Sequence, residues 1–320
     1  MSDHLKDWLC RACEAKRIAL IAHVSPDGDT VGSALALRLA FLSKGKAVDV
    51  ICDGSVPQEM RWLAGADAFI RPEDAQGAYD AAIAVDVAGR RLLGKSEAVF
   101  DAAAVRFVID HHPTNEGYGN FNYIRGNECA CCVLAYDAIM EMGAELTVPM
   151  GTCLMLGLST DTGHFQYAYT TPKAFEVGAK LLELGVDVSN LTRILYRSPT
   201  KARVAITRIA YQKMRFELGG QVGVIELSQK DFDEAGCTPY ETGGLVNLAL
   251  EVQGVRMAVM SIERDGMIKA SLRAVEPDTV NDIAARFGGG GHAQAAGCSL
   301  NTTLEEATRQ ILAAIEEKLG

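Results

Sequence analysis

The sequence predicts an α/β protein in two parts: an N-terminal domain with a doubly wound, mainly parallel sheet, and a smaller C-terminal α/β domain with a mixed sheet. In the first half of the chain, short apolar runs alternate with segments whose apolar residues recur at helical spacing. In the last third, strand-like runs joined by a hairpin turn replace that alternation. The length, 320 residues, exceeds what one core usually holds, which also favours two domains.

The first half is predicted to contain at least four buried strands and one long helix between the first two. The apolar runs lie at residues 18–23, 47–52, 81–85 and 105–109. After the first run, Pro26 and Gly28 end the strand, and apolar residues at helical spacing predict a helix over residues 30–43, with Gly45 as its stop. Continuous apolar strands that alternate with helices are typical of a parallel sheet covered on both faces.

Helical patterns dominate the middle of the chain, and strands return after residue 220. Helices are expected at residues 131–142, 150–158, 172–184, 188–196 and 198–216. Antiparallel strands are expected at residues 222–227, 255–263 and 267–274, with a hairpin turn at residues 264–266, followed by helices at residues 280–286 and 304–319. These patterns place one domain at residues 1–190, a linker at 191–200 and a second domain at 201–320.

Composition limits the possible partners and location. The net charge is −10, and an acidic chain repels phosphate on average, so long duplex nucleic acid is not an expected partner, whereas a short anionic substrate held by local cations is compatible. No apolar run approaches the length of a membrane span, and the polar first residues do not resemble a signal peptide. Nine cysteines, an odd number, are expected to be free thiols in a reducing cytoplasm.

Acidic and imidazole side chains follow several of the predicted strands. His23, Asp86 and Asp110 each lie at or next to the carboxyl end of a predicted strand, where parallel sheets bind their ligands. The other candidates stand close to these positions or after an apolar helix: Asp27, Asp29, His111, His112 and Asp161. Each segment alone has an ordinary explanation as a capped turn, a helix cap or a surface loop. Together they are better explained by divalent metal, which compensates the cost of burying such groups.

Charge arithmetic favours two cations over one. Four carboxylates total −4, which two divalent cations balance, and two imidazoles can add neutral nitrogen ligands: Asp27, Asp29, Asp86, Asp161, His23 and His111. Two-metal sites activate a hydroxide near neutral pH and clamp both oxygens of an in-line displacement at phosphorus. Mixed aspartate and histidine ligands suit Mn²⁺ or Mg²⁺ and can also admit Co²⁺.

The chain resembles the DHH phosphoesterase family over nearly its whole length. The motif that names the family is present as Asp110-His111-His112, and the stretch from Ser271 to Gly297, with four glycines at 288–291, looks like the associated DHHA1 domain. Spacing and length are most similar to the subgroup of nano-RNases that also dephosphorylate 3′-phosphoadenosine 5′-phosphate. This resemblance implies an active-site cleft between the two domains, and a homodimer is compatible with it.

The resemblance also implies a role for each candidate residue. One metal, Mn²⁺ before Mg²⁺ or Co²⁺, would be held by His23, Asp27 and Asp86, and the other by Asp29, Asp86, His111 and Asp161, with Asp86 bridging. The catalytic group would comprise Asp86, His112 facing the substrate and Asp110 orienting an imidazole or the loop. Substrate contacts would come from His112, Asn115, Arg273, Gly289, Gly290, Gly291 and His292.

Some of these substrate contacts have alternatives. The glycines could bring backbone N–H groups close to an anion, ahead of a helix starting at Ala293, or form a flexible loop. Asn115 could stabilise a turn instead of binding substrate. Phe165, Tyr167 and Tyr169 could stack a base or pack in the core.

The function expected from the sequence is an enzyme that hydrolyses very short RNA to 5′-mononucleotides and removes the 3′-phosphate of 3′-phosphoadenosine 5′-phosphate, without a membrane or duplex partner. A cyclic or linear di-AMP phosphodiesterase is an alternative, because the same ligands serve that chemistry. A catalytically silent nucleotide-binding module is an alternative of another class. It is disfavoured because every expected ligand is present in the sequence.

Overall fold

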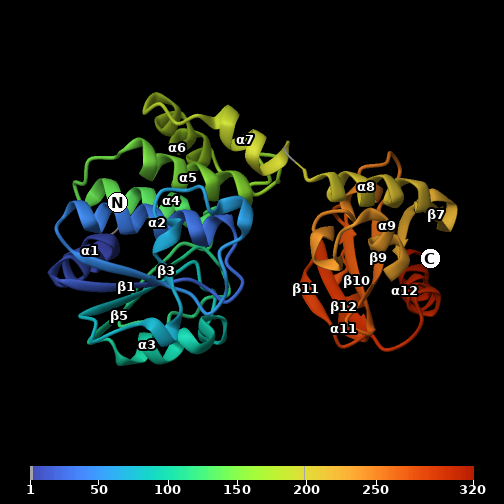
Figure 1. Cartoon of the computed structure of the whole chain (residues 1–320), viewed down its shortest axis with the longest axis horizontal. Coiled ribbons are helices and arrows are strands. Elements are labelled where there is room, and N and C mark those ends of the chain that lie inside the picture. The colour runs from blue at the N-terminus through green and yellow to red at the C-terminus, as the bar shows by residue number, and fades with distance from the viewer. Residues whose placement is uncertain (1–2, 198) are drawn as a thin grey trace. The chain divides into compact units, whose positions relative to one another are not determined.

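The structure is a computed structural model that describes residues 3–197 and 199–320. It contains two compact units, the N-terminal unit Met1–Arg197 and the C-terminal unit Ser198–Gly320 (Figure 1). The boundary falls inside the stretch 191–200 that the sequence suggests as a linker. Within that stretch, residues 191–196 complete helix α7 (Val188–Tyr196).

The N-terminal unit is built on a six-stranded sheet with the order β3-β2-β1-β4-β5-β6, in which all neighbouring strands are parallel. The predicted doubly wound parallel sheet is therefore confirmed. Its central strand β4 is buried at every position, as expected for a sheet covered on both faces. The strands are β1 (Arg17–Ile21), β2 (Ala47–Ile51), β3 (Phe69–Ile70), β4 (Ala81–Val85), β5 (Val105–Asp110) and β6 (Phe121–Ile124).

Helices cover both faces of this sheet (Figure 1). On one face, the larger apolar core packs the sheet against four helices, α1 (Asp3–Glu14), α2 (Gly28–Ser43), α4 (Cys131–Glu141) and α5 (Val148–Asp161). The core of the other face includes Phe100 of α3 (Glu97–Ala102). The other two helices, α6 (Pro172–Glu183) and α7, pack against α5.

Two glycines let α2 and α5 approach each other closely. A Cβ added at Gly32 would lie 2.3 Å from the carbonyl oxygen of Cys153, and one added at Gly157 would lie 2.6 Å from Asp29 Oδ1. Both distances are too short for a real side chain, so the absence of side chains sets the helix separation. The end of α5 is thereby brought next to the start of α2, where several of the predicted site residues lie.

The C-terminal unit has its own six-stranded sheet, ordered β11-β12-β10-β9-β8-β7. Helices α11 and α12 pack on one face and α8, α9 and α10 on the other. The strands are β7 (Arg215–Glu217), β8 (Val222–Leu227), β9 (Met257–Arg264), β10 (Met267–Ala274), β11 (Gly290–His292) and β12 (Ala295–Leu300). The helices are α8 (Lys201–Lys213), α9 (Gln229–Ala235), α10 (Asn247–Leu250), α11 (Asn281–Arg286) and α12 (Leu304–Leu319).

This sheet confirms the predicted mixed topology but corrects details within it. The hairpin between β9 and β10 is present, with Asp265 and Gly266 at positive φ as a two-residue turn requires. Strand β8, expected to be antiparallel, instead runs parallel to β9, because α9 and α10 intervene and return the chain to the same edge. The helix expected to reach residue 216 ends at Lys213, and Arg215 begins β7.

The residues after the four glycines also differ from the prediction. Ala293, Ala295 and Ala296 do not start a helix, since Ala295 begins β12, which pairs with β10 and β11. Small residues suit this strand because its neighbours approach closely, and a Cβ at Gly291 would lie 2.5 Å from the carbonyl oxygen of Ala295.

Among the described residues, none of the helices combines the length and apolar character that crossing a membrane requires.

Candidate metal centre

The predicted site residues of the N-terminal unit gather at the carboxyl edge of its sheet. His23 lies two residues after β1, Asp86 follows β4 directly, and Asp110 is the last residue of β5. Two helices add the remaining carboxylates at the same edge: Asp27 and Asp29 at the start of α2, and Asp161 at the end of α5. The adjacent carboxyl ends of parallel strands therefore bring together residues that are far apart in the sequence.

The start of α2 orients the first carboxylate. Asp27 is the N-cap of this helix, and its Oδ1 accepts hydrogen bonds from the N–H groups of Asp29 and Thr30, each at 3.1 Å. Asp27 Oδ1 also lies 3.9 Å from His23 Nε2. The cap thus holds the Asp27 side chain beside the imidazole that follows β1.

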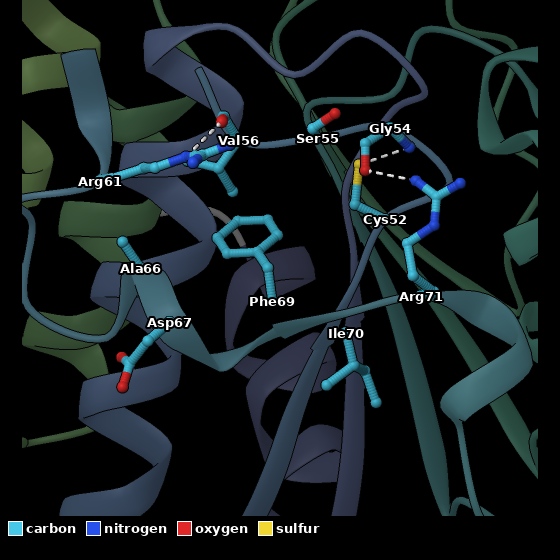
Figure 2. Close-up of a pocket in the computed structure, with 10 residues that line it drawn as sticks. All are labelled: Cys52, Gly54, Ser55, Val56, Arg61, Ala66, Asp67, Phe69, Ile70 and Arg71. Atoms are coloured by element: carbon cyan, nitrogen blue, oxygen red, sulfur yellow. Dashed lines mark hydrogen bonds between the residues drawn. The ribbon is translucent and has the colours of Figure 1, made fainter. Parts of the chain in front are cut away.

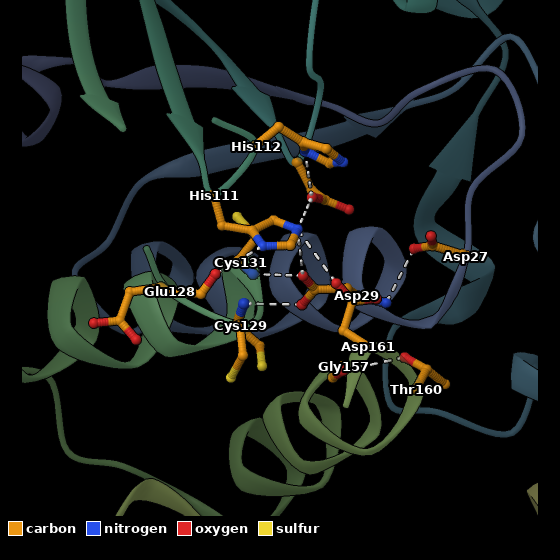
Figure 3. A network of polar contacts seen from close by, with 12 residues as sticks. Asp27, Asp29, His111, His112, Glu128, Cys129, Cys131, Gly157, Thr160 and Asp161 are labelled. Atoms are coloured by element: carbon orange, nitrogen blue, oxygen red, sulfur yellow. Dashed lines mark hydrogen bonds and ion pairs between the residues drawn. The ribbon is translucent and has the colours of Figure 1, made fainter. Parts of the chain in front are cut away.

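Asp29 is fully buried and is held by donors from two helices. Ser33 Oγ donates to its Oδ1 at 3.2 Å, and the N–H of Cys132 donates to the same oxygen at 2.8 Å. The N–H of Cys131 donates to Oδ2. Because Cys131 and Cys132 begin α4, the positive end of that helix partly compensates the buried carboxylate (Figure 3).

Asp86 gives the clearest indication that this region suits a cation. Its backbone is in the left-handed region, with φ of 58°, a conformation that aspartate tolerates better than most residues. Thr30 Oγ1 donates to its Oδ2 at 2.6 Å. Its Oδ1 is buried and makes no hydrogen bond to the described residues, and His111 Nε2 lies 3.5 Å away. A buried anionic oxygen without a donor is costly, and a cation would satisfy it.

His111 is oriented so that one ring nitrogen faces the carboxylates (Figure 3). Its Nδ1 lies 3.2 Å from the carbonyl oxygen of Glu128, which can accept the Nδ1 proton. Its Nε2 then faces Asp161 Oδ2 at 3.2 Å and Asp29 Oδ2 at 3.9 Å. A backbone carbonyl that fixes the tautomer in this way is the usual partner of a metal-binding histidine.

Three sets of ligand atoms in this region are each compact enough to hold a metal ion. Within each set the ligand atoms lie within 4.8 Å of one another: His23 with Asp27 and Asp86, Asp29 with His111 and Asp161, and Asp86 with His111 and His112. Carboxylate oxygens and imidazole nitrogens suit divalent ions such as Mn²⁺ and Mg²⁺. The donor set and the unsatisfied Asp86 Oδ1 therefore fit a divalent metal centre.

The pKa shifts of these side chains also indicate that the site favours a cation. Burial, together with the charge of Asp161, raises the pKa of Asp29 to about 7, and burial raises the pKa of Asp161 to about 6 although His111 opposes the shift. Burial and the neighbouring carboxylates raise the pKa of Asp86 well above its usual value. Burial disfavours protonation of His111, but Asp161, Asp29 and Asp86 outweigh it and raise its pKa to about 10. The crowded carboxylates thus attract positive charge.

Asp110 is not among these ligand groups and instead supports the loop that follows β5. Its Oδ1 accepts from the N–H of His111 at 2.9 Å and lies 2.8 Å from His112 Nδ1. This hydrogen bond raises the pKa of His112, since it stabilises the protonated ring. Asp110 therefore orients His112 and leaves the Nε2 of that ring directed elsewhere.

Asn115 is engaged inside the protein. Its Nδ2 donates to Asp110 Oδ2 at 2.6 Å and to the carbonyl of Val87 at 3.0 Å, and its Oδ1 accepts from the N–H of Gly117 at 2.9 Å. Both N–H donors of the amide are used, its oxygen accepts one hydrogen bond, and the residue is buried. These contacts are those of a turn-stabilising asparagine, and substrate binding by Asn115 stays a prediction.

The remaining predicted residues lie in the C-terminal unit, where the structure brings them to the two strands on either side of β12. Arg273 on β10 and His292 on β11 both pair with Ala295 on β12, so the three share one register row. Arg273 Nη1 donates to the carbonyl of Leu272 at 2.9 Å. The side chain of His292 lies outside the part of the chain that the structure describes.

The glycine run is more constrained than a flexible loop. Gly290 and Gly291 belong to β11, which pairs with β12. The N–H of Gly289 donates to the carbonyl of Ala284 at the end of α11, and a Cβ on Gly289 would lie 2.1 Å from the carbonyl oxygen of Gly297. The N–H of Gly289 is thus already used within the fold, and close strand packing explains why this position is glycine.

Figure 2 shows the residues that line a cavity of about 660 Å³. This cavity lies at the carboxyl edge of the parallel sheet, as the metal-ligating groups do. It is lined in part by Cys52, directly after β2, and by Ile70 and Arg71 at the end of β3. Cys52 Sγ donates to the carbonyl of His23 at 3.2 Å, so the cavity wall adjoins the segment that carries His23. None of the predicted site residues lines it, and the ligand groups described above lie outside it.

Sequence reasoning did not identify several groups that position these ligands. Thr30 and Ser33 act through their hydroxyls, and the N–H groups of Cys131 and Cys132 act through the backbone. The sequence contained a signal for the hydroxyls. Thr30 lies three residues after Asp27, and Ser33 lies four residues after Asp29, a spacing of about one helical turn. No side-chain signal reveals the two backbone donors, which only the fold brings to Asp29.

Comparison with known proteins establishes the family. The family model for the DHH family, N-terminal domain, matches residues 17–158, and the model for the DHHA1 domain matches residues 209–320. A protein of Thermus thermophilus named bifunctional oligoribonuclease and PAP phosphatase NrnA is 30% identical over 306 residues, which cover 94% of this chain and 90% of that protein. The chain belongs to the DHH/DHHA1 family.

Other DHH/DHHA1 proteins show the same likeness. A protein of the same name from Bacillus subtilis is 26% identical over 302 residues, 93% of each chain. A solved structure of an exopolyphosphatase-related protein from Bacteroides fragilis superposes with a TM-score of 0.91 at 26% identity, covering 98% of this chain and 95% of that one. RecJ of Thermus thermophilus in complex with Mn²⁺ shares the fold, with a TM-score of 0.57 at 14% identity over 98% of this chain and 53% of RecJ.

The metal centre predicts the behaviour of an Asp86→Asn variant. Asparagine tolerates the left-handed backbone and can accept from Thr30, but it lacks the anionic oxygen. A cation present at about 100 times its dissociation constant, and bound only to the folded state, stabilises the fold by about 2.7 kcal/mol. We expect Mn²⁺ to raise the melting temperature of the unaltered protein relative to EDTA, and this rise to be lost in Asp86→Asn.

The matched control for that variant is Asp7→Asn, which removes an exposed carboxylate from α1. Its melting temperature should rise with Mn²⁺ as in the unaltered protein. An equal rise in Asp86→Asn and Asp7→Asn would contradict the assignment of Asp86 as a ligand.

Metal binding is also expected to release protons and to weaken as the pH falls. At pH 7, His111 is protonated in the metal-free protein because its pKa is about 10, and Asp29 is partly protonated because its pKa is about 7. Both must lose protons to act as ligands, and Asp161 becomes protonated in turn near pH 6. Calorimetric titration with Mn²⁺ in two buffers of different ionisation enthalpy measures the number released, and identical heats in both buffers would rule out this protonation scheme.

Proposed function

We propose that this protein is a metal-dependent phosphoesterase that hydrolyses short oligoribonucleotides to 5′-mononucleotides and converts 3′-phosphoadenosine 5′-phosphate to AMP. The observation that carries the proposal is the buried Asp86 Oδ1, which has no hydrogen-bond donor among the described residues and belongs to a compact group of metal-ligating side chains. The names of the DHH/DHHA1 relatives that align over about nine-tenths of the chain support this substrate class.

The residues proposed to hold two divalent ions, with Mn²⁺ the favoured metal, fall into two sets that share Asp86. His23 and Asp27 complete one set, and Asp29, His111 and Asp161 complete the other. When bound, two such cations lower the pKa of water and neutralise charge on phosphoryl oxygens. The protein contributes preorganisation, because Thr30, Ser33 and the start of α4 hold Asp86 and Asp29 in place without a metal.

His112 is proposed to protonate the leaving oxygen of the substrate. Asp110 engages its Nδ1 at 2.8 Å, which favours the protonated ring and leaves the Nε2 proton for transfer. Its side chain remains one-third exposed, whereas Asp110 is fully buried. Asp110 is accordingly a positioning residue, and His112 is the residue in contact with substrate.

The C-terminal unit is proposed to bind the substrate's other phosphate through Arg273 and His292, which lie on the two strands that flank β12. A net charge of −10 supports short substrates over long duplexes, since binding of long nucleic acid needs broad positive potential.

Across the described chain all nine cysteines are free thiols, which supports our proposal of a reducing, cytoplasmic location.

A substrate panel tests the proposed function. We expect Mn²⁺-loaded protein to show its highest kcat/KM with the dinucleotide pApA and with 3′-phosphoadenosine 5′-phosphate. Lower values are expected with a long RNA, cyclic di-AMP and pyrophosphate. The Asp86→Asn variant, purified in parallel, controls for contaminating nuclease. A higher kcat/KM with cyclic di-AMP or pyrophosphate, or equal rates for both proteins, would refute the proposal.

Replacement of Arg273 tests the role given to the C-terminal unit. Arg273→Ala should raise the KM for pApA about tenfold or more, the loss expected for a charge-assisted bond to phosphate, with little change in kcat. Arg309→Ala, which removes an arginine paired with Glu306 on α12, is the control and should leave both constants unchanged. A fall in kcat at unchanged KM would show that Arg273 acts in the chemical step and not in binding.

A further inference from the structure

Two exposed tyrosines stand just beyond the carboxylate at the end of α5. Tyr167 is 48% exposed and Tyr169 is 60% exposed, so neither ring belongs to the core. Their ring centroids lie 5.5 Å apart with the planes tilted by 41°. They form an adjacent pair of aromatic faces on the surface of the N-terminal unit, and burial of apolar surface does not account for them.

Both rings contact the turn that begins at Asp161. Tyr169 Oη donates a hydrogen bond to the backbone carbonyl of Asp161 at 3.0 Å. The ring of Tyr167 covers Gly163, where an added Cβ would lie 2.5 Å from the ring carbons. The tyrosines are therefore held next to a residue of the metal centre, and their position follows that of α5.

The turn between Asp161 and the tyrosines is strained. Gly163, His164 and Phe165 are three consecutive residues in the left-handed region, with φ of 57°, 60° and 65°. This conformation is unfavourable for histidine and phenylalanine, at a cost on the order of 1 kcal/mol or more for each. Such strain is kept only where the surroundings enforce it, and it is often found at functional sites.

Several contacts enforce the turn. The N–H of His164 donates to the carbonyl of Ser159, and His164 Nδ1 lies 3.0 Å from Ser159 Oγ. The N–H of Phe165 donates to Thr162 Oγ1 at 2.9 Å, and its ring stacks on Phe175 with centroids 5.0 Å apart. The fold thus maintains a strained turn whose result is to present Tyr167 and Tyr169 beside Asp161.

We propose that Tyr167 and Tyr169 form a stacking surface for the base of the nucleotide whose phosphate lies at the metal centre. The inference rests on the proposed function, which places a phosphate there. Unpaired bases stack on exposed aromatic rings, and the contact tolerates any base because every base has an aromatic face. The hydrogen bond from Tyr169 to Asp161 explains why this position carries a hydroxyl, since it fixes the ring beside the site.

The test compares binding of AMP with binding of ribose 5-phosphate, which lacks the base, to Mn²⁺-loaded protein by calorimetry. The unaltered protein should bind AMP about fivefold or more tightly than ribose 5-phosphate, as expected for one stacked base. The variants Tyr167→Ala and Tyr169→Ala should lose most of this preference through weaker AMP binding, with ribose 5-phosphate binding unchanged. Tyr169→Phe retains the ring and should retain the preference.

Tyr211→Ala, which removes a tyrosine of similar exposure from α8, is the matched control and should keep the full preference. The proposal is overturned if the unaltered protein fails to prefer AMP, or if the preference persists in both alanine variants. Turnover of pApA is a separate measurement. Its absence in the unaltered protein would refute the proposed phosphoesterase activity, while the AMP comparison would still decide the stacking surface.

Discussion

The structure of the N-terminal unit depends on the electrostatic cost of holding several carboxylates at one edge of a sheet. Burial and mutual repulsion raise the pKa values of Asp29, Asp86 and Asp161, so their ionised forms are destabilised unless positive charge lies nearby. The fold supplies part of that charge through His111 and the first N–H groups of α4. Within residues 3–197 and 199–320, no group donates a hydrogen bond to Asp86 Oδ1, and this buried, uncompensated negative charge suits the site to divalent ions.

Close helix packing makes the arrangement possible. Gly32 and Gly157 allow α2 and α5 to approach until their ends meet, which brings the start of one helix and the last turn of the other to the same place. A larger residue at either position would move Asp29 away from Asp161 and lower the charge density of the site. The same packing carries the strained turn after α5 and, with it, the exposed tyrosines.

The predictions from sequence succeeded where a local pattern has one structural meaning. Buried apolar runs followed by acidic residues predicted the parallel sheet and the edge at which His23 and Asp86 lie. The helix predicted at 150–158 is also present, as α5, but it begins at Val148 and continues to Asp161. The predictions failed where contacts with remote segments of the chain determine the structure. The direction of β8 depends on the elements that return the chain to β9, and the small residues at 293–296 suit a closely packed strand as well as a helix. One partner of Asn115, the carbonyl of Val87, comes from a distant segment that no local pattern identifies.

By itself, then, the sequence determined the fold class, the order of its elements and the residue types that meet at the carboxyl edge, because apolar periodicity and strand ends are local properties of the chain. Only the tertiary structure decided which atoms face one another. Examples are the unsatisfied oxygen of Asp86, the backbone donors to Asp29 and the exposure of Tyr167 and Tyr169. Distances, burial and hydrogen-bond partners arise when remote segments pack, and no local pattern encodes them.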